Sequence, residues 1–82
     1  MVVEYSGAAL KQISTLHPAI AKRIRDKIAL YAANPSALAS QVKRLKGSRL
    51  LRLRVGDYRV IFTEDGRVLL VLRVGHRREI YD

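Results

Sequence analysis

This sequence contains no cysteine, which excludes disulfides, thiolate nucleophiles and metal sites built on cysteine. It has only two histidines, and so small a number does not favour a zinc site. No apolar run approaches the roughly 18 residues that a membrane span needs. The N-terminus lacks the pattern of a secretory signal, in which an apolar stretch follows basic residues. We therefore expect a cytoplasmic protein that spans no membrane and uses neither a metal nor another cofactor.

Acidic residues are also scarce, since seven Asp and Glu stand against sixteen Lys and Arg and leave a net charge of +9. Residues 1–41 carry +3 of this charge and residues 42–82 carry +6. Eleven of the sixteen basic residues are arginine, whose planar guanidinium binds phosphate in a bidentate way that lysine does not match. Such a field favours nucleic acid, the ribosome, an acidic protein or an anionic membrane as partner. The alternative is a basic protein whose charge serves solubility alone.

Eighty-two residues make one small domain, residues 1–82. Alternating apolar residues predict strands, and apolar residues at three- to four-residue spacing predict helices. The predicted elements, in order, are a strand, two helices and three strands: Val2–Tyr5, Gly7–Thr15, Pro18–Ala33, Leu50–Val55, Tyr58–Thr63 and Arg67–Val74. A further short strand or extended edge is expected within Gln41–Arg49. The result is a two-layer α+β fold, β-α-α-β-β-β, in which a helical hairpin covers one face of an antiparallel sheet.

Two local signals mark the helices. Ser6 is expected to cap the first helix, whose apolar stripe consists of Leu10, Ile13 and Leu16. His17 precedes Pro18, which suits the first turn of the second helix, and we interpret His17 as structural.

Arginines alternate with apolar residues around the turn Gly56-Asp57. If these two residues form a hairpin loop, Arg54 lies directly opposite Arg59 on one face of the sheet. On the other face Leu53 then meets Val60, and Leu51 meets Phe62. Like charges that face each other destabilise a hairpin, so we interpret the arginines, including Arg52, as a surface for an anion.

The side on which Arg73 lies depends on the next turn. A three-residue loop at Glu64-Asp65-Gly66 sets Arg59 opposite Val71 and puts Arg73 with the other arginines. A two-residue loop at Asp65-Gly66 puts Arg73 on the other face, because a shift of one residue reverses every side chain. The sequence leaves both registers open.

Three tracts resemble one protein family. They are Arg44-Leu45-Lys46-Gly47, then Leu51 through Phe62 with Arg54-Val55-Gly56-Asp57-Tyr58-Arg59 at its centre, and finally Gly75-His76-Arg77-Arg78-Glu79-Ile80-Tyr81. Together with the β-α-α-β-β-β order, they resemble the RelE/ParE toxin superfamily of type II toxin–antitoxin systems, most closely its RelE branch. The resemblance implies a fold like that of microbial ribonucleases. It also implies a toxin that cuts mRNA in the ribosomal A site by attack of the RNA's own 2′-hydroxyl.

The resemblance assigns roles to single residues. Arg59 matches the arginine that stabilises the phosphorane, and Arg77 matches a tail arginine that contacts phosphate or protonates the leaving group. Tyr81 matches a tyrosine that stacks on or orients a base. Arg52 stands where the family's best-known member has a lysine proposed as general base, and Leu50 replaces a second lysine.

These two replacements change the expected chemistry. An arginine, with a pKa of about 12.5 or higher, is a poor proton acceptor, so Arg52 is expected to bind phosphate or to lower the pKa of the 2′-hydroxyl. His76 has an ordinary pKa near 6.5 and is our candidate general acid or base. Its alternative role is that of a turn histidine.

Further basic residues are expected to bind RNA around these catalytic candidates. For the basic residues before Gly47, the alternative is a place on a solvated connection. The predicted RNA-binding residues are Lys43, Arg44, Lys46, Arg54, Arg73 and Arg78.

The resemblance also implies partners: an acidic antitoxin with an amphipathic helix, the ribosome with its mRNA, and operator DNA only through the antitoxin complex. No membrane partner is expected. Two other functions remain open. One is a non-enzymatic inhibitor of DNA gyrase, as in the ParE branch, and the other is a silent family member kept as an antitoxin or DNA-binding partner. Arg59, Arg77 and Tyr81 together favour the nuclease.

Overall fold

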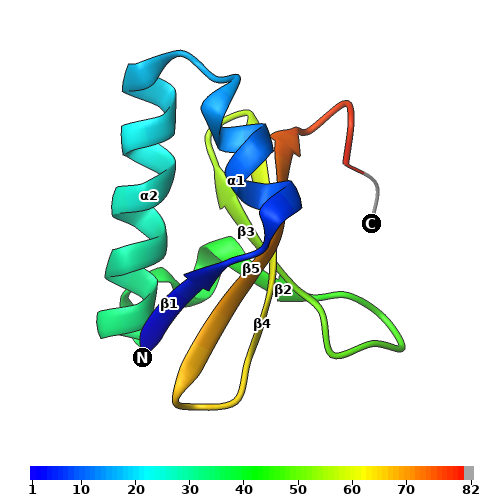
Figure 1. The fold of residues 1–82 in the computed structure, drawn as a ribbon. Helices are drawn as coiled ribbons and strands as arrows, with labels where there is room; N and C mark the ends of the chain where they lie inside the picture. Colours follow the sequence, from blue (N-terminus) through cyan, green and yellow to red (C-terminus); the bar gives the residue numbers. More distant parts are fainter. Residues whose placement is uncertain (81–82) are drawn as a thin grey trace.

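The computed structural model describes residues 1–80, which form a two-layer α+β domain (Figure 1). The helical segments are α1 (Gly7–Ser14), α2 (Pro18–Ala33) and the 3-10 helix η1 (Pro35–Gln41). The strands are β1 (Val2–Tyr5), β2 (Val42–Arg44), β3 (Leu51–Val55), β4 (Tyr58–Glu64) and β5 (Val68–His76). Within residues 1–80, no helix is long and apolar enough to cross a membrane. The predicted fold class is confirmed, and β2 is the additional short strand.

The five strands form one sheet in the order β1-β5-β4-β3-β2. Strands β2 to β5 are antiparallel to their neighbours, whereas β1 pairs with β5 in parallel, with Val2 beside Val68 and Tyr5 beside Val71. The prediction of a purely antiparallel sheet is therefore wrong at this edge. The helices and strands β2 to β4 separate β1 from β5 in the sequence, and a long connection of this kind lets neighbouring strands run in the same direction.

Side chains in front of the helices fix where each begins. The Ser6 hydroxyl accepts a hydrogen bond from the backbone N–H three residues on (3.0 Å) and donates one to the carbonyl of Leu72 (2.9 Å). It therefore caps α1 and ties it to β5. Before α2, His17 Nδ1 accepts a hydrogen bond from the N–H of Ala19 (3.1 Å), and Pro18 occupies the first helical position. The structural role expected for His17 is confirmed.

The buried stripe of α1 differs from the prediction. Ala9 and Ile13 are buried, while Leu10 is 56% exposed. A helix of eight residues has only about two turns, and its contact with β5 is made by the pair at i and i+4. The expected stripe through Leu10 is therefore wrong, although Ile13 is correctly placed in it.

The core lies between α2 and the sheet. Its largest fully buried side chains are Phe62, Ile24, Ile28, Leu53, Leu69, Val60 and Val71. The Tyr31 ring meets the Phe62 ring edge-on, with centroids 5.2 Å apart. Burial and, after it, the hydrogen bond and charge of Glu64 raise the pKa of Tyr31 to about 12. Tyr31 is thus part of the core.

Candidate functional site

The β3–β4 hairpin has the predicted register. Arg54 lies opposite Arg59, and Leu51 lies opposite Phe62. Gly56 makes the turn possible, because its φ of 58° is a conformation that side-chain-bearing residues rarely adopt. Since directly opposed residues share one face of a sheet, Arg54 and Arg59 lie side by side on the face away from the helices. We call this surface the arginine face.

The strand β5 adds Arg73 to the arginine face. Arg73 lies opposite Ile61, which in turn lies opposite Arg52, and Gly75 lies opposite Arg59. A three-residue loop correctly predicts that Arg73 lies on the arginine face. Its predicted pairing of Arg59 with Val71 is wrong, because Arg59 pairs with Gly75. Four residues separate the paired ends of β4 and β5, because Asp65 Oδ1 accepts hydrogen bonds from the N–H groups of residues 67 and 68 (2.8 Å each). The same two bonds lower the pKa of Asp65.

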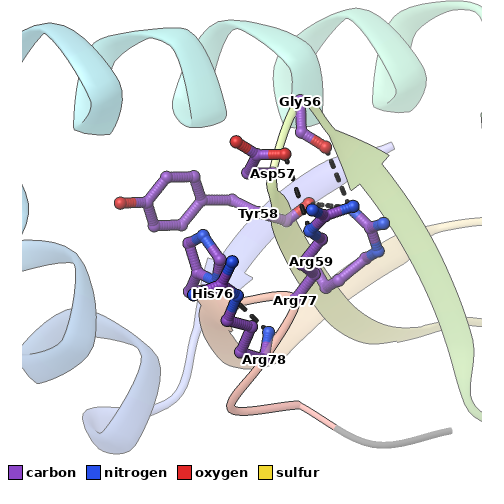
Figure 2. Close-up of polar contacts among 7 residues, drawn as sticks. All are labelled: Gly56, Asp57, Tyr58, Arg59, His76, Arg77 and Arg78. Atoms are coloured by element: carbon purple, nitrogen blue, oxygen red, sulfur yellow. Dashed lines mark hydrogen bonds and ion pairs between the residues drawn. The ribbon is translucent and has the colours of Figure 1, made fainter.

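Arg59 is at the centre of the site. The Nη1 of Arg59 donates hydrogen bonds to the carbonyls of Gly56 and Tyr58, both at 2.9 Å (Figure 2). These bonds hold the guanidinium against the β3–β4 hairpin. Partial burial lowers the pKa of Arg59, and the neighbouring charges of Arg52, Arg54 and Arg77 lower it further, while Asp57 acts in the opposite direction. Three other arginines therefore act on this group, and one carboxylate partly offsets them.

Arg77 is brought to the same place by the turn. Its backbone N–H donates a hydrogen bond to the carbonyl of Asp57 (2.7 Å), and its Nε lies 3.7 Å from Asp57 Oδ1 (Figure 2). Asp57 therefore fixes the start of the C-terminal tail beside the β3–β4 turn. As a result, arginines that are eighteen residues apart in the sequence, Arg59 and Arg77, share one cationic centre.

His76 lies apart from this centre. It pairs with Tyr58 across the sheet, and the two rings meet edge-on with centroids 5.5 Å apart. Its Nδ1 accepts a hydrogen bond from the N–H of Arg78 (3.2 Å), and the ring lines a hollow toward α1 together with Gln12 and Glu79. Figure 2 shows the ring beside Tyr58 and away from Arg59. This geometry is that of the turn histidine, the second of the two roles considered for it.

The other predicted RNA-binding residues do not all lie on the arginine face. Lys43 lies opposite Arg52 and so joins the arginine face. Arg44, the next residue in β2, lies opposite Leu51 and has its charge near Tyr31 on the helical side. Lys46 and Arg78 are exposed in the β2–β3 loop and in the tail, respectively. Tyr81 lies outside the described residues.

The sequence reasoning missed an apolar spot on the arginine face. Ile61 is 4% exposed and Ile80 is 5% exposed, and neither belongs to the core under the helices. Ile80 packs over Gly75, where a Cβ would come within 3.1 Å of Ile80 Cγ1. The tail thus folds back onto the sheet through Ile80. The run Arg59-Val60-Ile61 offered a signal for this contact, because strict alternation places Ile61 among the arginines.

We expect the crowding of the cations to lower the stability of the fold. We expect Arg54→Gln to raise the free energy of unfolding by about 0.2–1 kcal/mol at low ionic strength, because it removes a like charge directly opposite Arg59. Urea unfolding measures the change. The gain should disappear near 1 M NaCl, where the Debye length is about 3 Å. Arg67→Gln, in the exposed β4–β5 loop, is the control for net charge, and an equal gain for both variants would contradict the interpretation.

Comparison with known families agrees with this geometry. Residues 3–81 match the family described as the ParE toxin of type II toxin-antitoxin system, parDE. The chain belongs to the ParE toxin family. It is a toxin of a type II toxin–antitoxin system and has a RelE-like fold. No curated protein matches this ParE-family toxin by sequence.

Solved structures show the fold of this ParE-family toxin in related proteins. The archaeal RelE–RelB complex from Pyrococcus horikoshii OT3 is 25% identical, with a TM-score of 0.78 over 96% of this chain and 97% of that chain. The RelB–RelE antitoxin–toxin complex from Methanococcus jannaschii is 28% identical, with a TM-score of 0.76 over 96% and 95%. The intact E. coli RelBE toxin–antitoxin complex is 21% identical, with a TM-score of 0.71 over 92% and 94%. All three are RelE–RelB complexes, and the second and third are described as complexes of a toxin with its antitoxin.

Proposed function

We propose that this ParE-family toxin is a ribosome-dependent endoribonuclease that cuts mRNA in the A site. The observation that carries the proposal is the meeting of Arg54, Arg59 and Arg77 beside the β3–β4 turn. Guanidinium groups held this close repel one another, and this repulsion adds to the effect of burial in lowering the pKa of Arg59. A phosphate that enters from outside would relieve it, and arginine binds phosphate in a bidentate way.

The proposed reaction needs no metal. The 2′-oxygen of one nucleotide forms a bond to the adjoining phosphorus and releases its proton to the surroundings, while the bond from phosphorus to the 5′-oxygen of the next nucleotide breaks. That 5′-oxygen takes up a proton, so the products are a 2′,3′-cyclic phosphate and a 5′-hydroxyl. Arg59 and Arg77 stabilise the extra negative charge of the phosphorane. Arg52 binds phosphate or lowers the pKa of the 2′-hydroxyl.

Two residues complete the proposal. Tyr81 stacks on or orients a base next to the scissile phosphate, which aligns the attacking hydroxyl. His76 stays a candidate acid or base, but its bond to the N–H of Arg78 and its contact with Tyr58 favour a role in shaping the tail. Proton transfer would then fall to groups of the ribosome or to water.

The same proposal names the partners. The toxin acts in the cytoplasm, where it meets ribosomes and mRNA. A cognate acidic antitoxin neutralises it through an amphipathic helix, and operator DNA is contacted only through the toxin–antitoxin complex. The net charge of +9 supports both an acidic protein partner and an RNA target.

A second function is supported by the family description, which names the ParE toxin of parDE systems. In that alternative the protein inhibits DNA gyrase and cuts nothing. Its arginines would then bind a protein or DNA surface and would have no role in a chemical step.

Primer extension on mRNA bound to translating ribosomes decides between the two. We expect new 3′ ends inside the A-site codon with the native toxin and none with Arg77→Ala. Arg67→Ala is the matched control, because it removes one exposed arginine at the opposite end of β5 and should cut normally. Intact mRNA from a preparation that still arrests growth would contradict the nuclease, and inhibition of gyrase supercoiling by that preparation would establish the alternative.

A further inference from the structure

A second cationic hollow lies next to the site described above. It has a volume of about 170 Å³ and is lined by Ser40, Gln41, Lys43, Arg52 and Arg54. It lies where η1 ends and β2 begins, beside β3. Asp57, which offsets the charges of Arg59 and Arg77, is not among these five residues, and none of the five is acidic.

The positions of its cations are set by the sheet and not by flexible loops. Lys43 on β2 lies directly opposite Arg52 on β3, and Arg54 follows two residues later on the same face. Arg54 in turn lies opposite Arg59 on β4. Two like-charged pairs therefore lie across neighbouring strands, and they concentrate positive charge on one part of the sheet.

Neutral donors complete the hollow. Gln41 Nε2 donates a hydrogen bond to Ser40 Oγ (3.2 Å), so the Ser40 hydroxyl proton and the second amide N–H of Gln41 can be donated to a third group. The backbone that carries them is anchored, because Leu38 in η1 is 4% exposed and the N–H of Val42 donates to the carbonyl of Ala39. Cations and neutral donors around one hollow are the chemistry of a phosphate site.

We propose that this hollow binds the phosphodiester group adjacent to the scissile one on the same RNA strand. The inference rests on the proposed function and deepens it, because it adds Ser40 and Gln41 to the substrate contacts and gives the RNA a direction across the sheet. Neighbouring strands lie about 4.8 Å apart, so an RNA backbone that crosses them passes from β2, at Lys43, to β4, at Arg59. One linkage then lies at Lys43 and the adjacent one at Arg59, with Arg54 on the strand between them.

The probe for this site is a 2′-O-methyl trinucleotide without terminal phosphates, which has two charged linkages and cannot be cut. In a ¹H–¹⁵N NMR titration at low salt, we expect shifts at Gln41 and Lys43 as well as at Arg59 and Arg77. Lys43→Ala should weaken binding about two- to fivefold, the range of a single exposed ion pair. Lys27→Ala, which makes the same change in net charge on α2 on the other side of the molecule, should leave the affinity unchanged.

Two singly charged probes locate the contact. In each, one of the two linkages is a neutral methylphosphonate. Lys43→Ala should weaken binding of one of these probes and not of the other, while Arg59→Ala should show the reverse preference. Equal effects on both probes would overturn the site, as would an absence of shifts at Gln41 and Lys43 at millimolar trinucleotide.

The outcome for this hollow is independent of the outcome for the nuclease. If ribosome-bound mRNA stays intact while the two-probe pattern appears, the proposed reaction fails and the phosphate site stands. If mRNA is cut while Gln41 and Lys43 show no shifts, the second site fails and the reaction stands.

Discussion

Arg59→Ala is expected to slow mRNA cleavage on the ribosome by about two to three orders of magnitude, the loss that follows removal of one preorganised donor to a developing charge. The reason is its place at the centre of the cations, where its fork is fixed by the carbonyls of Gly56 and Tyr58 before any RNA arrives. Single-turnover primer extension measures the rate. Arg59→Lys should recover only part of it, because an ammonium keeps the charge but loses the bidentate geometry.

The fold of Arg59→Ala should stay intact. The variant loses two hydrogen bonds, each with a net contribution of about 1 kcal/mol, and at the same time escapes repulsion from Arg52, Arg54 and Arg77. Thermal unfolding followed by circular dichroism should therefore remain cooperative and change little. A collapsed melting curve would mean that Arg59 is structural, and full cleavage by a folded variant would remove it from the mechanism.

Gly75→Val is expected to reduce cleavage by about a hundredfold, the cost that a displacement of about 1 Å can have at a catalytic group. Gly75 has no left-handed φ, so the position requires a small side chain only because of the space that Ile80 occupies. A Cβ would meet Ile80 Cγ1 at 3.1 Å and Cδ1 at 3.2 Å, and valine adds two methyl groups. The tail that carries Arg77 must then move off the sheet.

Hydrogen exchange detects this movement without any activity assay. The amide of Arg77, bonded to the carbonyl of Asp57 at 2.7 Å, should exchange faster in Gly75→Val, while amides of the core strands should keep their protection. In a Gly75→Ala background, Ile80→Ala should relieve the contact and restore part of the cleavage. Normal exchange at Arg77, or no relief from Ile80→Ala, would show that this contact does not position the tail.

The sequence predicted the β3–β4 hairpin down to its register because a two-residue turn at Gly56 leaves only one way to pair the flanking strands. It could not decide the next register. There, Asp65 bonds two backbone N–H groups and lengthens the loop, and an irregularity between Ile61 and Phe62 shifts the pairing again. The alternation of apolar and polar residues encodes neither the hydrogen bonds of Asp65 nor the irregularity.

The same limit applies to direction and to faces. Apolar periodicity identifies Val2–Tyr5 as a strand, but parallel and antiparallel strands have the same period, so the pairing of β1 with β5 was mispredicted. The sequence also shows that Lys43 and Arg44 are basic, but it does not show which face of the sheet each one lies on. In β2, Lys43 lies on the arginine face and Arg44 lies on the side of Tyr31. A strand of three residues is too short for its pattern to fix a face.

The sequence predicted which residues make up the candidate site better than it predicted the contacts that hold them together. Four arginines share one face of the sheet, as predicted by the longer of the two loops considered between β4 and β5: Arg52, Arg54, Arg59 and Arg73. The contacts that organise them come from the tail, where Asp57 holds Arg77 and Ile80 covers Gly75. These contacts join segments that are far apart in the chain, so no local sequence pattern predicts them.

The parallel pairing of β1 with β5 also sets the order in which the protein can assemble during its own synthesis. β1 emerges from the ribosome first, yet the carbonyls of Arg67 and Val71 that bond its edge belong to the last part of the sheet. Gly75 and Arg77 come still later. The pairing of β1 with β5 therefore cannot form until both ends of the chain are available, and contacts between residues so far apart in the sequence slow folding. While β5 is still inside the exit tunnel, the nascent toxin therefore lacks both the edge pairing of its first strand and the arginines that β5 and the tail supply.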